Sequence, residues 1–354
     1  MLLKKKLCIV ALFCGILFFM FATHAIQKNN ILSISVEAPY TTAGLVTKNH
    51  TVSQLVVKSV LQGSCGCPTC VADRGISEWF DQRYDHKQQP YLTKDGNEID
   101  RLALKWWLGL QRSVDGTLEE VMKKMFTVIS PPPVEELHQP KLCRTCAVVG
   151  NSGNLLQSKY GAVIDSHSMV FRMNKATTLG FEQYVGNKTT HHFMYPESAV
   201  DLNPGVHLVL LPFKLKDLQW VTSALSTGEI KTTYVRVKER VQADKDKVIV
   251  VNPSFFKYTH DHWTEHHGRY PSTGMLAIVF ALHLCDEVSV FGYGADSQGN
   301  WHHYWEENKY AGAFRKTGVH NADFEREIIH KLYTEGKIKL YPKVEKQANL
   351  KLKI

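Results

Sequence analysis

Residues Cys143 to Asn154 read CRTCAVVGNSGN, and this stretch decides the class of fold. Two cysteines lead into a short apolar strand, which stops in a Gly/Asn/Ser loop. Such a loop is a natural cradle for phosphate, because glycines let the backbone approach a ligand and the first amides of a following helix point at negative charge. Alone, the loop is also ordinary turn chemistry, since Gly150-x-x-Gly153 lacks the full dinucleotide fingerprint and a Walker lysine.

The chain after this stretch alternates short apolar runs with amphipathic ones, which is the pattern of a parallel sheet covered by helices. We predict strands at Ala147–Gly150, Met169–Met173, His191–Tyr195, Val206–Phe213, Val248–Asn252, Val288–Tyr293 and Ile338–Tyr341. Predicted helices include Leu215–Ser226, Gly274–Cys285 and Ala322–Glu335. The last helix places Phe324, Ile328, Ile329 and Leu332 on one face, as a helix on a sheet should. The predicted fold class is α/β: a single Rossmann-like domain with a mostly parallel seven-stranded sheet flanked by helices.

The N-terminus predicts a membrane anchor. Three lysines at positions 4–6 precede an apolar run that extends to Ile26, about the ~20 residues that a membrane helix needs. Positive residues on the short leading side predict a cytoplasmic N-terminus. The competing interpretation is a cleaved signal peptide, which the sequence Ala22-Thr23-His24-Ala25 permits weakly. We therefore expect a cytoplasmic tail at 1–6, a transmembrane signal anchor at 7–26, a polar stem at 27–63 and a lumenal domain at 64–354.

Cysteine usage agrees with a lumenal domain. Two of the eight cysteines lie in the anchor; the other six are Cys65, Cys67, Cys70, Cys143, Cys146 and Cys285. An even number in an oxidising compartment predicts three disulfides. The two Cys-x-x-Cys pairs allow a zinc site as the alternative. Glycosylation sequons begin at Asn49 and Asn187; Asn49 in the stem is the better acceptor, and we expect little occupancy at Asn187, beside the sheet edge.

Composition limits the partners. With 354 residues, 44% of them hydrophobic, the chain can form one large domain after an anchor and a stem. The net charge of +8 is spread along the sequence, apart from a lysine-rich C-terminus. In a lumenal compartment this charge suits acidic small ligands or solvation, and we expect no nucleic acid.

Polar residues follow four of the predicted strands. Asn151 follows the first strand, Asn174 the second, Tyr195 the third and Gly294 the sixth. Ligands of open parallel sheets collect beyond the carboxyl ends of the strands. Polar loops at strand ends are common in any protein, but four such residues in one sheet favour a binding site.

Two later segments add chemistry to this edge. Ser272 and Thr273 precede a helix and would present its first amides to an anion, although either residue can act as a simple N-cap. The run Gly299–Glu306 (GNWHHYWE) sets aromatic rings beside histidines, which is typical of sugar sites. His303 and His320 lie in loops as a candidate phosphate partner and base. Glu325 is expected either to cap its helix or to orient His320.

These segments resemble a known family. CRTCAVVGNSGNL with RMN, VGNKTTHHFMYPES, RYPSTGM, CDEVSVFGYGADSQGNWHHYWE and KTGVHNADFE match the large, small, third and very-small sialylmotifs of animal sialyltransferases. The sequence is most similar to the β-galactoside α2,3-sialyltransferases that act on Galβ1-3GalNAc, of the core 1 O-glycan and ganglioside type. The resemblance extends from about Cys65 to Tyr341 and leaves out the anchor, the stem and the basic tail.

The resemblance implies an inverting transferase with a glycosyltransferase A-type variant of the Rossmann-like fold. It implies CMP-sialic acid as donor, the 3-hydroxyl of galactose as acceptor, and a single-pass type II position in the Golgi membrane. His320 would be the general base, and His303 would bind the CMP phosphate. The implied donor-binding residues are Asn151, Ser152, Asn174, Tyr234, Tyr270, Ser272, Thr273, Gly274 and Gly294; the acceptor-binding residues are Gln111, Tyr195 and Trp301. The implied disulfides are Cys65–Cys70, Cys67–Cys143 and Cys146–Cys285.

No metal or other cofactor is expected. A monophosphate leaving group needs less charge neutralisation than a diphosphate, and one histidine with helix and loop amides can supply it. The segment Asp244-Lys245-Asp246 precedes a strand and carries a central lysine, so we interpret it as a solvated turn and not as a metal motif.

Other functions stay open at this stage. A sialyltransferase with another galactoside preference is one, and a catalytically silent lumenal glycan-binding protein is another, although the presence of both His303 and His320 argues against silence. A nicotinamide oxidoreductase would need Gly-x-Gly-x-x-Gly and an acidic residue after the next strand, where this chain has Arg172 and Asn174. The oligomeric state is undetermined, with a homodimer as one option.

Overall fold

The computed structural model of this chain describes residues 65–97, 99–111, 116–133, 142–296, 298–308 and 318–342. The predicted tail, anchor and stem lie outside the described residues, as does Asn49. Among the residues that are described, no helix has both the length and the apolar character needed to cross a bilayer.

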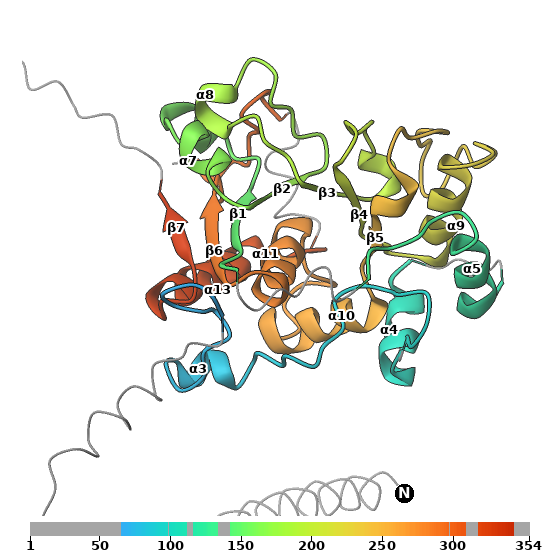
Figure 1. The fold of residues 1–354 in the computed structure, drawn as a ribbon, viewed down its shortest axis with the longest axis horizontal. Coiled ribbons are helices and arrows are strands. Elements are labelled where there is room, and N and C mark those ends of the chain that lie inside the picture. The colour runs from blue at the N-terminus through green and yellow to red at the C-terminus, as the bar shows by residue number, and fades with distance from the viewer. Residues whose placement is uncertain are drawn as a thin grey trace, which may run out of the picture. The chain divides into compact units, whose positions relative to one another are not determined.

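A seven-stranded sheet forms the centre of the domain (Figure 1). The strands are β1 Thr145–Val149, β2 Met169–Met173, β3 His191–Met194, β4 His207–Leu210, β5 Val248–Val250, β6 Glu287–Phe291 and β7 Lys339–Tyr341. They lie in the order β5-β4-β3-β2-β1-β6-β7, and every ladder is parallel. The order reverses next to β1, so the loop after β1 lies at the switch point where ligands of such sheets bind.

Helices cover both faces of the sheet. The longer ones are α4 Arg101–Leu110, α5 Leu118–Met125, α9 Leu215–Ala224, α11 Thr273–Leu284 and α13 Ala322–Thr334. Shorter helices are α3 Glu78–Asp81, η1 Gly153–Gln157, α7 Gly161–Asp165, α8 Glu182–Val185, η2 Pro196–Ser198, η3 Lys245–Lys247, α10 Pro253–Tyr258 and the π-helical turn η4 Thr259–Trp263. Figure 1 shows α7 and α8 on one side of the sheet and α11 and α13 on the other.

Alternating side chains of the strands divide the core into layers. Val148, Phe171 and Phe193 share one cluster with α11, which is apolar on all sides and almost wholly buried. Their neighbours Ala147 and Val170 point to the opposite face, where they pack against residues of α7 and α8. At the β4 and β5 end of that same face, a third cluster packs beneath α9 and α5. The predicted α/β domain with its flanked parallel sheet is therefore confirmed.

All seven predicted strands and all three predicted helices exist, with ends that differ by a few residues. The largest difference is β4, which ends at Leu210 where the prediction ran to Phe213. Pro212 has no amide hydrogen to continue the ladder, although Leu211 still donates to Met194 O at 2.9 Å. Helices α4 and α5 were not predicted. The sequence contains a signal for α5, the capping box of Thr117 and Glu120 at its first turn.

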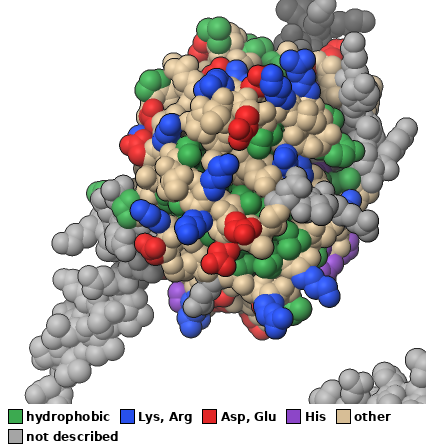
Figure 2. Space-filling view, turned by 90° about the vertical axis from the view of Figure 1, so that its right-hand side faces the viewer, with side chains coloured by type: hydrophobic (Ala, Val, Ile, Leu, Met, Phe, Trp, Pro, Cys, Tyr) green, Lys and Arg blue, Asp and Glu red, His purple; other side chains and the backbone are tan. Residues whose placement is uncertain are grey.

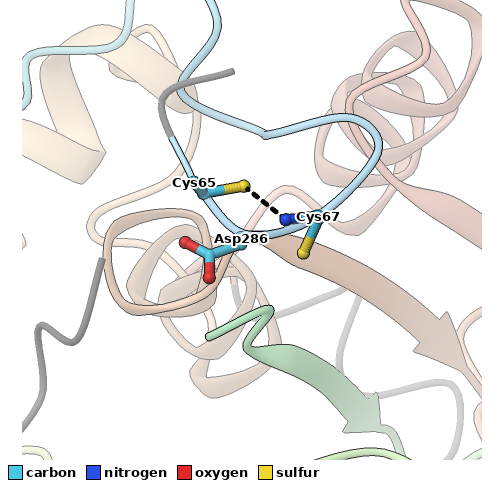
Figure 3. Close-up of side chains that lie close together, drawn as sticks. All are labelled: Cys65, Cys67 and Asp286. Atoms are coloured by element: carbon cyan, nitrogen blue, oxygen red, sulfur yellow. Dashed lines mark hydrogen bonds between the residues drawn. The ribbon is translucent and has the colours of Figure 1, made fainter. Parts of the chain in front are cut away.

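Three disulfides join the six described cysteines: Cys65–Cys70, Cys67–Cys143 and Cys146–Cys285. This is the pairing that the family resemblance implies. Two groups of potential metal ligands lie together, and one of them is Cys65, Cys67 and Asp286 (Figure 3). Their sulfur atoms are bonded in disulfides and cannot act as thiolate ligands. The cysteines are therefore cross-links, and the alternative of a cysteine zinc site is wrong.

The segment Asp244-Lys245-Asp246 lies away from the carboxyl edge of the sheet. Asp244 precedes β5, at the amino edge, and accepts a hydrogen bond from Gly205 N at 2.7 Å. Asp246 is exposed, so this segment is the solvated turn that we predicted. Figure 2 shows Lys and Arg side chains interspersed with Asp and Glu side chains on the face that it presents.

Candidate active site

A cavity of about 850 Å³ lies beyond the carboxyl ends of the strands. Residues that follow β1, β2, β3 and β6 line it, together with the N-terminus of α11. All the residues predicted for catalysis, donor and acceptor lie on its walls: Gln111, Asn151, Ser152, Asn174, Tyr195, Tyr234, Tyr270, Ser272, Thr273, Gly274, Gly294, Trp301, His303 and His320. The fold thus brings together side chains that are more than two hundred positions apart in the sequence.

The loop after β1 lies directly against the loop after β6. Gly150 N donates to Phe291 O at 2.8 Å, and Ser152 N donates to Gly292 O at 3.0 Å. A Cβ on Gly150 would come within 2.4 Å of Gly292 O, so only glycine permits this approach. The hydroxyl of Ser152 donates to Gly294 O at 2.7 Å and fixes the two loops at the floor of the cavity.

Asn151 and Gln111 bring unpaired amide oxygens to the cavity. Asn151 Nδ2 donates to Met173 O at 3.1 Å, which orients the side chain, whereas its Oδ1 is buried with no hydrogen-bond partner among the described residues. The Oε1 of Gln111, directly after α4, is in the same state. A buried carbonyl oxygen without a donor costs free energy, so each is suited to accept a hydrogen bond from a ligand.

Asn174 is held in a left-handed conformation, with φ of 58°, at the end of β2. Ser198 Oγ donates to its Oδ1 at 3.0 Å, and His192 Nε2 bonds to its carbonyl oxygen at 2.6 Å. Burial lowers the pKa of His192 to about 4, so the ring is neutral and its Nε2 carries the donated proton. These contacts stabilise a conformation that few residues other than glycine adopt.

The N-terminus of α11 forms another wall. Ser272 is its N-cap, accepting from Met275 N at 3.1 Å. Gly274 packs against the ring of Tyr293, whose hydroxyl donates to Gly274 O at 3.0 Å. The helix is twelve residues long, so its first amides and dipole favour an anion at this end.

Glu325 does not cap α13, and the described hydrogen bonds of its carboxylate go to Ser272 and not to His320. Asn321 caps the helix, accepting from Phe324 N at 3.1 Å. The carboxylate of Glu325 instead accepts from Ser272 N at 2.7 Å and from Ser272 Oγ at 2.5 Å. Burial raises the pKa of Glu325 to about 7, against the two hydrogen bonds, which lower it. Glu325 therefore joins α13 to the start of α11, and neither of the expected roles was correct.

His320 is held by a carbonyl group. Its Nδ1 lies 2.8 Å from Tyr270 O, and since a carbonyl only accepts, Nδ1 carries the proton of the neutral ring and Nε2 carries the lone pair. Burial lowers the pKa of His320, although the bond to Tyr270 opposes the shift. Backbone pairing between Gly268 and His320 fixes the loop that carries the ring. His320 has the tautomer of a base that acts through Nε2.

His303 is oriented by a carboxylate and by stacking. Its Nδ1 bonds to Glu306 Oε1 at 2.9 Å, and the ring stacks on Trp305 with centroids 4.5 Å apart. Main-chain pairing with Ser152 brings the residue against the loop after β1. With Nδ1 engaged, Nε2 is the atom that can meet a ligand in the cavity.

Several cavity residues were not predicted. Glu197, Phe213, Tyr293 and His302 also line the cavity. Glu197 and Tyr293 follow β3 and β6. Because ligands bind beyond the carboxyl ends of parallel strands, these two positions could have been predicted to line the site. Phe213 follows β4 and Pro212. It was not predicted as a cavity residue because the predicted strand ran to Phe213 and so placed this residue inside the sheet.

The sequence and geometry define a class of protein: an α/β protein with a ligand site at the switch point of a parallel sheet, two oriented histidines and a helix N-terminus. The family model for glycosyltransferase family 29 (sialyltransferase) matches residues 91–337. CMP-N-acetylneuraminate-beta-galactosamide-alpha-2,3-sialyltransferase 2 of Rattus norvegicus is 52% identical over 313 residues, which are 86% of this chain and 89% of that protein. The corresponding sialyltransferase 1 of Homo sapiens is 47% identical over 293 residues, or 82% and 86%.

Solved structures agree. The chain is similar to the crystal structure of a mammalian sialyltransferase, with a TM-score of 0.73 and 47% identity, covering 79% of this chain and 99% of that one. The structure of a mammalian sialyltransferase in complex with Gal-beta-1-3GalNAc-ortho-nitrophenol gives the same TM-score at 46% identity, covering 79% and 100%. The chain belongs to glycosyltransferase family 29, the sialyltransferases.

Proposed function

We propose that this enzyme transfers sialic acid from CMP-sialic acid to the 3-hydroxyl of the terminal galactose in Galβ1-3GalNAc, with inversion at the anomeric carbon. The observation that carries the proposal is a single cavity lined by two histidines, each held through Nδ1, and by the N-terminus of α11. Relatives with 47% and 52% identity are named beta-galactosamide-alpha-2,3-sialyltransferases, which supports this acceptor class.

In this mechanism His320 is the general base. Its Nε2 takes the proton from the galactose 3-hydroxyl while the oxygen attacks C2 of sialic acid, and the bond from C2 to the CMP phosphate oxygen breaks. A neutral ring is required, and burial lowers the pKa of His320, which favours the neutral form. The bond to Tyr270 O supports the imidazolium that forms.

His303 assists the leaving group. In its protonated form, with Nδ1–H donating to Glu306, it would donate from Nε2–H to the phosphate of CMP as negative charge develops there. The first amides of α11 and the Ser152 and Asn151 loop would hold the rest of CMP, with the remaining donor contacts from Asn174, Tyr234 and Gly294. Gln111, Tyr195 and Trp301 would bind the acceptor sugars, since aromatic rings cover sugar C–H faces and the amide meets hydroxyls.

The test uses a soluble fragment that begins near Gly63, with CMP-sialic acid and a Galβ1-3GalNAc glycoside. We expect transfer to the galactose, and loss of at least about a hundredfold in kcat for His320→Ala. Failure to transfer sialic acid to any galactoside would contradict the proposed enzymatic activity and leave the glycan-binding protein as the alternative. Full activity of His320→Ala would overturn the assigned base alone.

The same assay tests independence from metals. Because histidine, loop amides and a helix N-terminus can neutralise a monophosphate leaving group, we expect unchanged rates after EDTA. A rate that collapses with EDTA and returns with a divalent cation would contradict this.

We further propose a single-pass type II position in the Golgi membrane, with 7–26 as anchor and the catalytic domain at 64–354 in the lumen. The lysines at 4–6, the apolar run and the three disulfides support it. Protease protection of the domain in intact vesicles tests this topology. Digestion of the domain without detergent would show that it lies on the cytoplasmic side. A homodimer is compatible with the proposal, and sedimentation of the fragment decides it.

A further inference from the structure

Tyr234 lies at the rim of the cavity with little to hold its side chain. It is 79% exposed, and it sits in the 231–237 loop, where Thr232 pairs with Arg236 through the main chain. A side chain this exposed makes few packing contacts, so the position of its ring is set chiefly by the backbone that carries it.

One carboxylate fixes that backbone. Glu197 Oε1 accepts from the main-chain amide of Tyr234 at 3.2 Å and also from the hydroxyl of Thr233. Both donors lie at the tip of the 231–237 loop, whereas Glu197 belongs to η2, directly after β3. The contact therefore joins the loop to the carboxyl end of the sheet.

The carboxylate of Glu197 is held in place by the buried Lys214. Lys214 is only 5% exposed, and its Nζ lies 3.2 Å from Glu197 Oε1 and 2.7 Å from Asp217 Oδ1. Burial opposes ionisation of Glu197, but the hydrogen bond from Thr233 and the charge of Lys214 keep its pKa below the usual value. The carboxylate is thus charged, and charged acceptors form the stronger hydrogen bonds.

The turn that carries Glu197 is also rigid. Ser198 Oγ bonds to Asn174 Oδ1 at 3.0 Å, and Tyr195 N donates to Ser198 Oγ at 3.2 Å. Asn174 and Tyr195 are cavity residues that directly follow the neighbouring strands β2 and β3. The same three-residue turn therefore orients two walls of the cavity and, through Glu197, the 231–237 loop.

We propose that Glu197 is a positioning residue for the sialyl transfer: its carboxylate, held by Lys214, sets the 231–237 loop so that Tyr234 meets CMP-sialic acid. The inference rests on the proposed donor contact of Tyr234. Glu197 need not touch either substrate, and its effect passes through the loop.

Three variants of Glu197 distinguish the effect of side-chain length on donor binding from the effect of its charge. Glu197→Ala removes the acceptor, and we expect KM for CMP-sialic acid to rise about tenfold with kcat changed less than about twofold. Glu197→Gln keeps an oxygen at the same reach but loses the charge, so it should raise the donor KM by less than the alanine variant does. Glu197→Asp keeps the charge but is shorter, so it should resemble the alanine variant. Equal effects of all three on kcat, or none on KM, would overturn the inference.

A double-mutant cycle with Tyr234→Ala tests the route of the effect. If Glu197 acts through Tyr234, the double variant should show a donor KM close to that of Tyr234→Ala alone, because coupled residues are not additive. Multiplied effects would contradict the inference. If Tyr234→Ala leaves the donor KM unchanged, the proposed donor contact fails and the inference about Glu197 fails with it, whereas sialyl transfer by the parent protein still supports the proposed activity.

Thr233 supplies a milder test with a matched control. Thr233→Val removes one donor to Glu197 at a residue outside the cavity wall, and we expect a threefold to fivefold rise, about 1 kcal/mol of hydrogen bonding, in donor KM. Thr232→Val makes the same chemical change one position earlier, at an exposed side chain, and should leave KM unchanged. Equal KM values for these two variants would contradict the role of the Thr233 contact.

Discussion

At the scale of single residues, the protonation state of His320 determines how the reaction depends on pH, and its tautomer determines which nitrogen is the base. The bond from Nδ1 to Tyr270 O leaves the lone pair on Nε2, and burial lowers the pKa of the ring. Transfer needs the neutral ring, so kcat/KM should stay high as pH falls and decline only below the ordinary histidine value of 6.5.

Initial rates of sialyl transfer between pH 4.5 and 8, roughly two units either side of an ordinary histidine, measure this limb. The profile of Glu325→Gln serves as the control, since burial raises the pKa of this cavity carboxyl to about 7, inside the same pH range. An acid limb centred above 6.5 in both proteins would contradict the predicted state of His320.

Gly150 is the residue whose lack of a side chain the site most needs. A methyl group there would meet Gly292 O at 2.4 Å and the ring of Tyr293 at 2.9 Å. We expect Gly150→Ala to cost about 2 to 4 kcal/mol of unfolding free energy and to reduce donor binding, because two loops must separate.

Gly109 gives the matched control. It lies in α4 with nothing within 4 Å of an added Cβ, so Gly109→Ala should be neutral or stabilise by up to about 1 kcal/mol. Denaturant titration of both variants makes the comparison. Similar stabilities of the two would show that the loops after β1 and β6 can adjust.

At the scale of elements, the contact between α11 and α13 adds a pH dependence to stability. The pKa of Glu325 is raised to about 7 from an ordinary 4.5, so the folded state binds the proton more tightly than the unfolded chain. The contribution is complete below pH 4.5 and is lost as pH rises through about 7. Stability should therefore fall over this interval, by up to about 3 kcal/mol.

Glu325→Gln removes this titration while keeping an oxygen toward Ser272. The measurement is the unfolding free energy of both proteins at pH 5 and pH 8, either side of the shifted value of about 7. We expect the difference between the two pH values to be larger in the parent protein. A parent protein that gains stability on going to pH 8, relative to the variant, would show that the Ser272 hydrogen bonds outweigh burial.

The elements of the sheet and its helices were predictable because their signals are local. β1 and β2 are short apolar runs that stop at polar loops, and α13 shows a helical repeat of apolar residues. The contacts of Glu325 were not predictable. The sequence placed Glu325 within a predicted helix. Its partner Ser272, however, is 53 positions away, and only the packing of α13 beside α11 brings the two residues together.

At the scale of the whole molecule, the location of the site followed from one rule, that ligands bind beyond the carboxyl ends of parallel strands. Asn151, Asn174 and Tyr195 therefore converge as expected. Tyr234 and Gln111 were identified only through the family resemblance, because each comes from a segment without a strand before it. Glu197 was missed, since its role depends on Lys214 and on a loop distant in sequence.

The disulfides connect these distant parts, and their separations predict unequal contributions to stability. Cys146–Cys285 closes 139 residues between β1 and the end of α11, whereas Cys65–Cys70 closes five. Loop-closure entropy assigns about 5 kcal/mol to the first and about 2 kcal/mol to the second. Replacing both partners of each bridge by alanine, with thermal unfolding as the measurement, should lower the melting temperature much more for the long bridge. Cys146 is also fully buried, so its truncation adds a packing loss in the same direction. Equal melting temperatures would mean that the β1 to α11 contact holds without its bridge, because the unfolded chain already keeps these segments together.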